Sequence, residues 1–168
     1  MSLITEVSIV FYSTPMSKRG WLVQKLQCNP MFHCGLMFSY EDNSLILAAD
    51  KSHRAKFVPG SLYHDTIGFI PSHIVTLGTT EFSNIDRIMN FISTPYKGDT
   101  LSIFFWFFIG RFIFKSYQPK SCALLACNIA RFCGFSVPDF IHPPSLYKYI
   151  KNKYSHFTLE EYKKELQQ

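Results

Sequence analysis

Short apolar runs rich in β-branched and aromatic residues recur along the first half of the chain, with turn-forming residues between them. Such runs are typical of strands. They predict strands over residues 8–12, 32–40, 45–49 and 73–77, with weaker candidates over residues 56–58 and 66–70. The side chains of residues 41–44 (Glu-Asp-Asn-Ser) bond readily to their own backbone, which predicts a hairpin turn between the second and third strands. We therefore expect an antiparallel meander.

Apolar residues spaced three and four apart predict helices in other parts of the chain. The predicted helices cover residues 18–27, 80–93, 121–133, 143–149 or 143–151, and 159–166. The helix over 121–133 has the clearest limits, with Ser121 as its N-cap and Gly134 as its C-terminal stop. Thr158 and Glu161 form a capping-box pattern for the last helix. Because the sequence has no internal repeat or linker, the pattern predicts a single α+β domain over residues 1–168.

The composition is that of a folded, aromatic-rich protein. The 168 residues are enough to bury a core, and 47% of them are apolar against 17% charged, which excludes a disordered chain. The formal charge of +5 is modest, and the basic residues are scattered, with their densest group in residues 148–164. This distribution favours solubility or weak attraction to acidic surfaces. No interleaved basic and aromatic motif predicts a nucleic-acid partner.

The cysteines form no pattern that predicts disulfides or a metal site. There are five, an odd number at irregular spacing, whereas a disulfide framework has paired cysteines. No C-x-x-C pair is present, so we expect neither a zinc site nor another cofactor. The N-terminus lacks a basic region followed by a long apolar segment, the pattern of a signal peptide. We expect a reducing compartment, the cytoplasm of the parent cell or of a host.

One stretch imitates a membrane span. It begins at Leu101, ends at Phe114 and reads LSIFFWFFIGRFIF. Its length of about 14 residues is less than the roughly 20 that cross a bilayer, and Gly110 and Arg111 interrupt it. We therefore expect a buried helix with its following turn. The alternative is an interfacial segment that contacts the membrane surface.

Candidate chemistry begins with a cysteine at the predicted start of a helix. Cys122 directly follows the expected N-cap Ser121. The free N–H groups and the positive end of the dipole in a first helical turn favour thiolate over thiol. The competing interpretation is an inert thiol packed in the core, which is what we expect of Cys127 and Cys133 deeper in the same helix.

A histidine on a neighbouring strand would serve such a thiolate as ion-pair partner and proton donor. His33 lies in an apolar strand and is followed by Gly35, which lets a backbone or a ligand approach closely. A hydrogen-bonded core histidine is the competing interpretation of His33. The other histidines compete for the same role: His53, His64, His73, His142 and His156.

Five short motifs follow one another along the chain. They are GWLVQKL (residues 20–26), FHCGL (32–36), PY (95–96) with the stretch 101–114, SCALL (121–125) with CGF (133–135), and HPPSLY (142–147). In this order they resemble the circularly permuted NlpC-type papain-like superfamily. Its members include bacterial and viral peptidase- or amidase-like proteins and relatives of lecithin retinol acyltransferase, and in them the histidine strand precedes the cysteine helix.

The resemblance implies a permuted papain-like fold, in which an antiparallel sheet packs against helices and the nucleophile opens a helix. It implies Cys122 as the nucleophile and His33 as its base. It also implies a polar residue on the next strand that orients the imidazole, but the aligned position in residues 45–50 (LILAAD) is alanine. Asp50 is the nearest substitute and His53 a second option. Other catalytic triads lose orders of magnitude in rate without this group, so activity depends on a residue that orients the His33 imidazole.

The implied reaction is hydrolysis or acyl transfer at an amide or ester bond. The aromatic stretch 101–114 suits an apolar wall of the cleft, and therefore a lipid-like or acylated substrate. Two other classes stay open from the sequence. A catalytically degenerate homologue, for example a virus-encoded one, would bind a partner protein. A membrane-surface protein would use the stretch 101–114 together with the basic C-terminal region. The oligomeric state is left open.

Overall fold

The computed structural model of the chain describes residues 4–13, 21, 25, 29–31, 33–40, 43–48, 56–60, 71–81, 87–88, 121–158 and 161. The strands are β1 (Ile4–Tyr12), β2 (His33–Tyr40), β3 (Asn43–Ala48), β4 (Lys56–Pro59), β5 (Pro71–Glu81) and β6 (Ser155–Thr158). The helices with described bounds are α6 (Cys122–Phe132) and α7 (Pro143–Ile150). The architecture is α+β, as the sequence predicts.

The strands form one six-stranded sheet in the order β4-β3-β2-β1-β5-β6. Every neighbouring pair is antiparallel. The predicted meander holds from β1 to β4. β5 then departs from it, because it returns to pair with the free side of β1 instead of continuing beside β4. The first strand of the chain is therefore central in the sheet, and β2 lies directly beside it.

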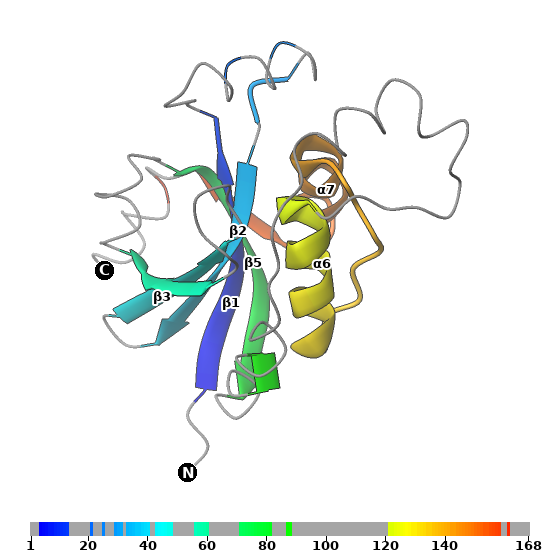
Figure 1. Cartoon of the computed structure of the whole chain (residues 1–168). Coiled ribbons are helices and arrows are strands. Elements are labelled where there is room, and N and C mark those ends of the chain that lie inside the picture. The colour runs from blue at the N-terminus through cyan, green and yellow to red at the C-terminus, as the bar shows by residue number, and fades with distance from the viewer. Residues whose placement is uncertain are drawn as a thin grey trace.

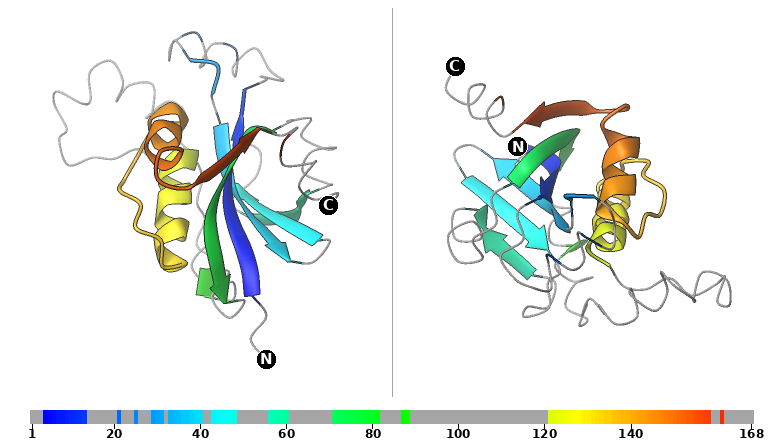
Figure 2. Two further views of the ribbon diagram at one scale, coloured as in Figure 1. Left: turned by 180° about the vertical axis from the view of Figure 1, so that it is seen from behind. Right: turned by 90° about the horizontal axis from the view of Figure 1, so that it is seen from above.

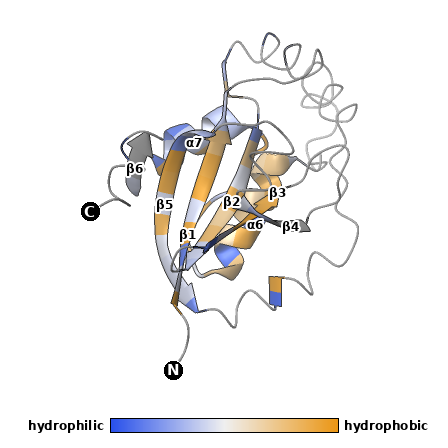
Figure 3. Cartoon of the chain, turned by 90° about the vertical axis from the view of Figure 1, so that its left-hand side faces the viewer, coloured by the Kyte–Doolittle hydropathy of each residue, from blue (hydrophilic) through white to orange (hydrophobic). Residues whose placement is uncertain are grey.

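Both helices cover one face of the sheet (Figure 1 and Figure 2). Side chains of a strand alternate between the two faces, so every second residue of β1 and β2 points toward the helices. These residues join the buried face of α6 in one apolar cluster, and Figure 3 shows the apolar colour along the central strands and along α6. The strand members of this cluster include Val7, Ile9, Phe11, Cys34, Leu36 and Phe38.

The described helices begin and end within one residue of the predicted limits. After α6, Gly134 has a φ of 91°. Its N–H donates to the carbonyl of Arg131 at 2.9 Å, and the N–H of Phe135 donates to the carbonyl of Ala130 at 3.0 Å. This is the Schellman arrangement that ends many helices at a glycine. α7 begins at Pro143, where the missing N–H of proline is not needed by the helix.

β5 runs further than the sequence predicts. It spans Pro71–Glu81, so Thr80, which is expected in a helix, belongs to the strand. The register with β1 shifts between Val7 and Ser8, opposite Gly78, which marks a bulge. Gly78 has a φ of 140°, which a residue without a Cβ tolerates. The glycine thus lets the strand continue where the pattern predicts its end.

β6 is absent from the predicted elements. It has four residues, Ser155–Thr158, and pairs with β5 at the edge of the sheet. Thr158, the expected cap of the last helix, is the last residue of this strand. The predicted hairpin turn is also shorter than expected, because Asn43 and Ser44 belong to β3 and Asn43 pairs with Tyr40. In both places pairing with a neighbouring strand outweighs the local preference for a turn or a cap.

Other predicted elements fall largely outside the described residues. Within the predicted helix 18–27, Trp21 and Lys25 are helical. Arg87 and Ile88 are helical within 80–93, and Glu161 within 159–166. The predicted strand over 66–70 and the stretch 101–114 lie wholly outside the described part of the chain.

Candidate active site

Cys122 is the first residue of α6, and its neighbour Ser121 fixes that position. Ser121 has an extended backbone and is buried. Its Oγ accepts a hydrogen bond from the N–H of Leu124 at 3.1 Å, and its carbonyl oxygen accepts one from the N–H of Leu125 at 3.0 Å. Because this is N-cap geometry, the half-buried Cys122 stands where the positive end of the helix dipole acts.

The start of β2 lies at the same end of the molecule as the start of α6 (Figure 1). β2 begins with His33 and Cys34, which are 7% and 0% exposed. Cys34 belongs to the apolar cluster between sheet and helices, and Cys122 packs against that cluster. The packing of the strand on the helix therefore brings His33, Cys34 and Cys122 together from distant parts of the sequence.

The pKa of the Cys122 thiol lies well below its ordinary value. The largest cause is a hydrogen bond with the Cys34 side chain. Burial opposes the shift, because it penalises a charged sulfur. The positive charge of His33, a hydrogen bond with its side chain and a hydrogen bond from the Cys34 backbone all add to the lowering. These contacts favour the thiolate form of Cys122 over the thiol.

Cys34 shifts in the opposite direction. Burial is the first cause that raises the pKa of its thiol, followed by the hydrogen bond to Cys122 and the charges of Cys122 and Cys127. The pair therefore divides into two roles, with Cys34 keeping its proton as donor and Cys122 carrying the negative charge. The helix N-terminus and His33 both favour this division, because both act on Cys122. Cys34 is absent from the predicted site residues, although its place directly after His33 is a signal in the sequence.

The sheet holds the ring of His33. His33 pairs with Tyr12 across β1 and β2, and their ring centroids lie 5.6 Å apart with the planes at 33°. Tyr12 is itself fully buried. Packing against a buried ring restricts rotation of the imidazole, so its orientation toward Cys122 is set partly by β1.

A second histidine, His142, also lies near Cys122. It is the residue before α7 and occupies the N-cap position of that helix. Burial lowers the pKa of its imidazole, and the charge of Cys122 opposes this lowering. The sequence places His142 only among the competitors for the base. The charge of Cys122 thus reaches the His142 imidazole, but burial favours the neutral form of that ring.

The remaining cysteines of α6 are ordinary buried thiols. Burial raises the pKa of Cys127 and of Cys133 to about 11 in each case. Both belong to the apolar cluster, as expected for core residues. At neutral pH they stay protonated, and a protonated thiol is a poor nucleophile.

Several other predicted candidates do not join this group. Asp50, His53 and His64 lie outside the described residues. His73 is on β5, where its ring centroid lies 4.8 Å from that of Tyr147 and its Nδ1 lies 3.1 Å from Ser72 Oγ. His156 is in β6 at the edge of the sheet.

The described residues offer neither of two other kinds of site. Within them, no group of three or more His, Cys, Asp or Glu side chains is arranged to hold a metal ion. None of their helices has the length and apolar character to cross a membrane. Comparison of the chain with protein-family models, curated proteins and solved structures gives no match.

Proposed function

We propose that this protein is a thiol-dependent hydrolase or acyltransferase that acts on an amide or ester bond through Cys122 and His33. The observation that carries the proposal is the placement of Cys122 at the first residue of α6 beside Cys34 and His33, whose contacts lower its pKa. A thiolate is the nucleophilic form of cysteine, and a neighbouring imidazole is the usual partner of a catalytic one.

Acylation is the first half of the proposed reaction. The Cys122 sulfur attacks the carbonyl carbon, and a C–S bond forms as the carbonyl oxygen becomes an oxyanion. The N–H of Cys122 belongs to the first turn of α6, where N–H groups have no partner within the helix, so it suits the developing charge. The C–N or C–O bond then breaks, and protonated His33 gives its proton to the leaving nitrogen or oxygen.

Deacylation completes the cycle. A water molecule, or the alcohol or amine of an acceptor, attacks the thioester carbon while His33 takes its proton. The C–S bond breaks and Cys122 returns to the thiolate. Hydrolase and acyltransferase thus share every protein group and differ only in the acceptor.

The same proposal includes the residue that orients the His33 imidazole and the fold family of the chain. We assign the orientation of the His33 imidazole to Asp50, with His53 as the second candidate. We also assign the chain to the permuted papain-like arrangement. Support for this comes from the order of elements, with a histidine strand in an antiparallel sheet before a helix that a cysteine opens. Asp50→Asn and His53→Ala variants test the orienting role, and the residue that fills it is the one whose loss lowers turnover more.

Trapping of an acyl-enzyme tests the reaction itself. p-Nitrophenyl esters with a short and a long acyl chain are suitable probes, because release of p-nitrophenolate reports acylation directly. We expect a burst of product and a protein mass increase of one acyl group, absent in Cys122→Ala and unchanged in Cys133→Ala, a matched control on the same helix. A burst that survives in Cys122→Ala would contradict the proposal.

The same experiment separates the catalytic protein from a degenerate homologue that only binds a partner. A homologue without an oriented base still has a reactive thiolate, so it would acylate once and stay acylated. Repeated turnover after the burst therefore supports a complete site. A preference for the long-chain ester would support a lipid-like or acylated substrate.

A further inference from the structure

We infer that Cys34 and Cys122 form a redox pair, in which a peroxide oxidises Cys122 and Cys34 then closes a reversible disulfide that blocks the nucleophile. The inference rests on the reactive thiolate of the proposed function. It needs no acyl substrate, and it assigns to Cys34 a role that catalysis does not require.

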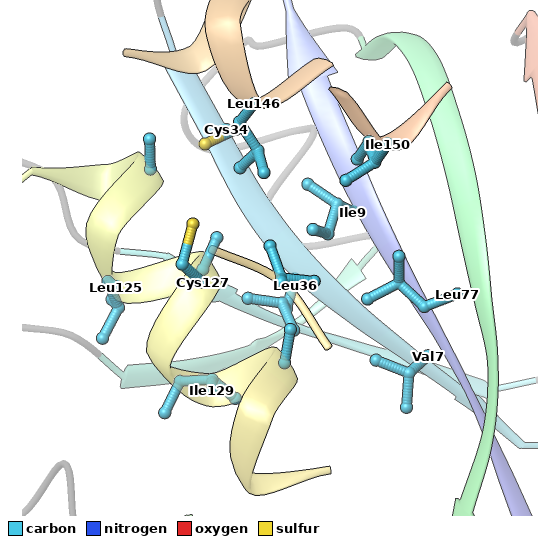
Figure 4. Packing of buried hydrophobic residues seen from close by; sticks show 14 of the residues in the cluster. Val7, Ile9, Cys34, Leu36, Leu77, Leu125, Cys127, Ile129, Leu146 and Ile150 are labelled. Carbon is cyan, nitrogen blue, oxygen red and sulfur yellow. The ribbon is translucent and has the colours of Figure 1, made fainter. Parts of the chain in front are cut away.

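The arrangement of the two thiols fits the two roles of such a pair. Cys122, the first residue of α6, is half-buried and is therefore the more exposed of the two cysteines. Cys34 is 0% exposed and lies in the layer between β2 and α6, where Figure 4 shows its sulfur beside the helix. The side-chain hydrogen bond between them means that the Cys34 thiol already faces the Cys122 sulfur. A resolving cysteine needs this proximity, and its burial protects it from direct oxidation.

The chemistry is a two-step oxidation with hydrogen peroxide or an organic hydroperoxide as the oxidant. In the first step the Cys122 thiolate attacks the peroxide oxygen, the O–O bond breaks, and Cys122 becomes a sulfenic acid. Hydroxide, or the alkoxide of an organic hydroperoxide, leaves and takes up a proton from the solvent. In the second step the Cys34 sulfur attacks the Cys122 sulfur, the S–OH bond breaks, and the hydroxide leaves as water with the proton from Cys34. Overall, the Cys122 thiolate and the Cys34 thiol are oxidised to a disulfide. With one proton from the solvent, hydrogen peroxide is reduced to two waters, or an organic hydroperoxide to water and an alcohol.

The charge coupling between the thiols favours the second step once the first has happened. The negative charge of Cys122 and the hydrogen bond to it are two of the causes that hold the proton on Cys34. A sulfenic acid at Cys122 is neutral, so the effect of its negative charge disappears on oxidation and the hydrogen bond to it weakens. Cys34 then loses its proton more easily, at the moment when its neighbour has become an electrophile.

The other thiols of α6 are poorer partners for Cys122. Cys127 follows by five residues, a spacing that places two side chains on different faces of a helix. Cys133 lies beyond the opposite end of α6, roughly 16 Å along the axis at the rise of an α-helix. Among the cysteines that the structure describes, Cys34 is therefore the partner that packing brings to Cys122.

Peptide mapping after peroxide treatment tests the pair. Tryptic cleavage leaves Cys28 beside Cys34 in one peptide and Cys127 beside Cys122 in another, so we use a Cys28→Ala/Cys127→Ala background. After peroxide, alkylation and non-reducing digestion, we expect a linked peptide that joins Cys34 to Cys122. Dithiothreitol should release it and restore iodoacetamide labelling of Cys122. Adding Cys34→Ala should abolish the link and carry Cys122 on to sulfinic acid.

Each outcome decides the inference. Sulfinic acid at Cys122 without a linked peptide in the background protein overturns it, as does a link from Cys122 to Cys133. The background protein alone gives this answer, so it stands even if the Cys34→Ala variant does not fold. An acyl-enzyme without the disulfide leaves the proposed function in place and removes the redox pair. The disulfide without an acyl-enzyme supports the redox pair and contradicts the proposed function.

Discussion

The thiol of Cys34 on β2 donates a hydrogen bond to the thiolate of Cys122 at the first residue of α6. Neither local sequence requires this contact. It exists because β2 and α6 pack through one apolar cluster, which contains Cys34 and against which Cys122 lies. The acidity of Cys122 therefore depends on a strand residue as well as on its own helix.

Replacing Cys34 by alanine should raise the pKa of Cys122, because the largest cause of its lowering is removed. At a pH below the pKa of Cys122 in both proteins, a rise of about one unit in that pKa reduces the thiolate fraction about tenfold. Iodoacetamide labelling of Cys122 across pH, followed by peptide mass spectrometry, measures this. The labelling profile should move to higher pH in Cys34→Ala and stay in place in Cys133→Ala. An unchanged labelling profile of Cys122 in Cys34→Ala would contradict a hydrogen bond from Cys34 that lowers its pKa.

The two histidines near Cys122 should differ in their effect on its acidity. His33→Ala removes a positive charge and a hydrogen bond that lower the pKa of Cys122, so labelling at about pH 6 should slow at least severalfold. His142 acts on Cys122 much less, because burial lowers its pKa and favours the uncharged ring. His142→Ala should therefore leave the labelling profile nearly unchanged. Equal slowing in both variants would mean that the thiolate has two cationic partners.

Removing the N-cap of α6 should destabilise the fold. Ser121→Ala loses the hydrogen bond from Leu124 N–H to Ser121 Oγ, and loss of such a cap costs about 0.5–2 kcal/mol. Urea unfolding followed by circular dichroism gives the change in the free energy of unfolding. Ser145→Ala on α7 is the control, because Ser145 is exposed and a surface change of this kind stays within about 0.5 kcal/mol. Similar values for the two variants would contradict a structural cap at Ser121.

The bulge glycine of β5 should tolerate substitution poorly. Gly78→Ala forces a side chain into a φ of 140° and places a Cβ 3.1 Å from Phe135 Cε1. Backbone conformations of this kind cost about 1–3 kcal/mol, and the close contact adds to that. Gly134→Ala is the matched comparison, since it also has a positive φ but a Cβ there meets nothing within 4 Å. Chemical denaturation should show the larger loss of unfolding free energy for Gly78→Ala, and the reverse order would contradict the bulge.

Local signals in the sequence determined most of the elements and one half of the candidate site. The strand runs predict β1, β2, β3 and β4, and Ser121 and Gly134 predict α6 to within a residue. These features follow from short-range chemistry, such as side-chain alternation, an N-cap oxygen and a glycine at positive φ. For the same reason the sequence places Cys122 in a first helical turn without knowledge of the rest of the fold.

The tertiary structure alone decided what surrounds that cysteine. The return of β5 to β1, the bulge at Gly78 and the edge strand β6 depend on pairing between distant segments, which no local pattern records. The Cys34 thiol and the His142 ring reach Cys122 for the same reason, because burial and charge coupling act across space. A residue type and its helix position make a cysteine a candidate, whereas its pKa is set by the groups that packing brings to it.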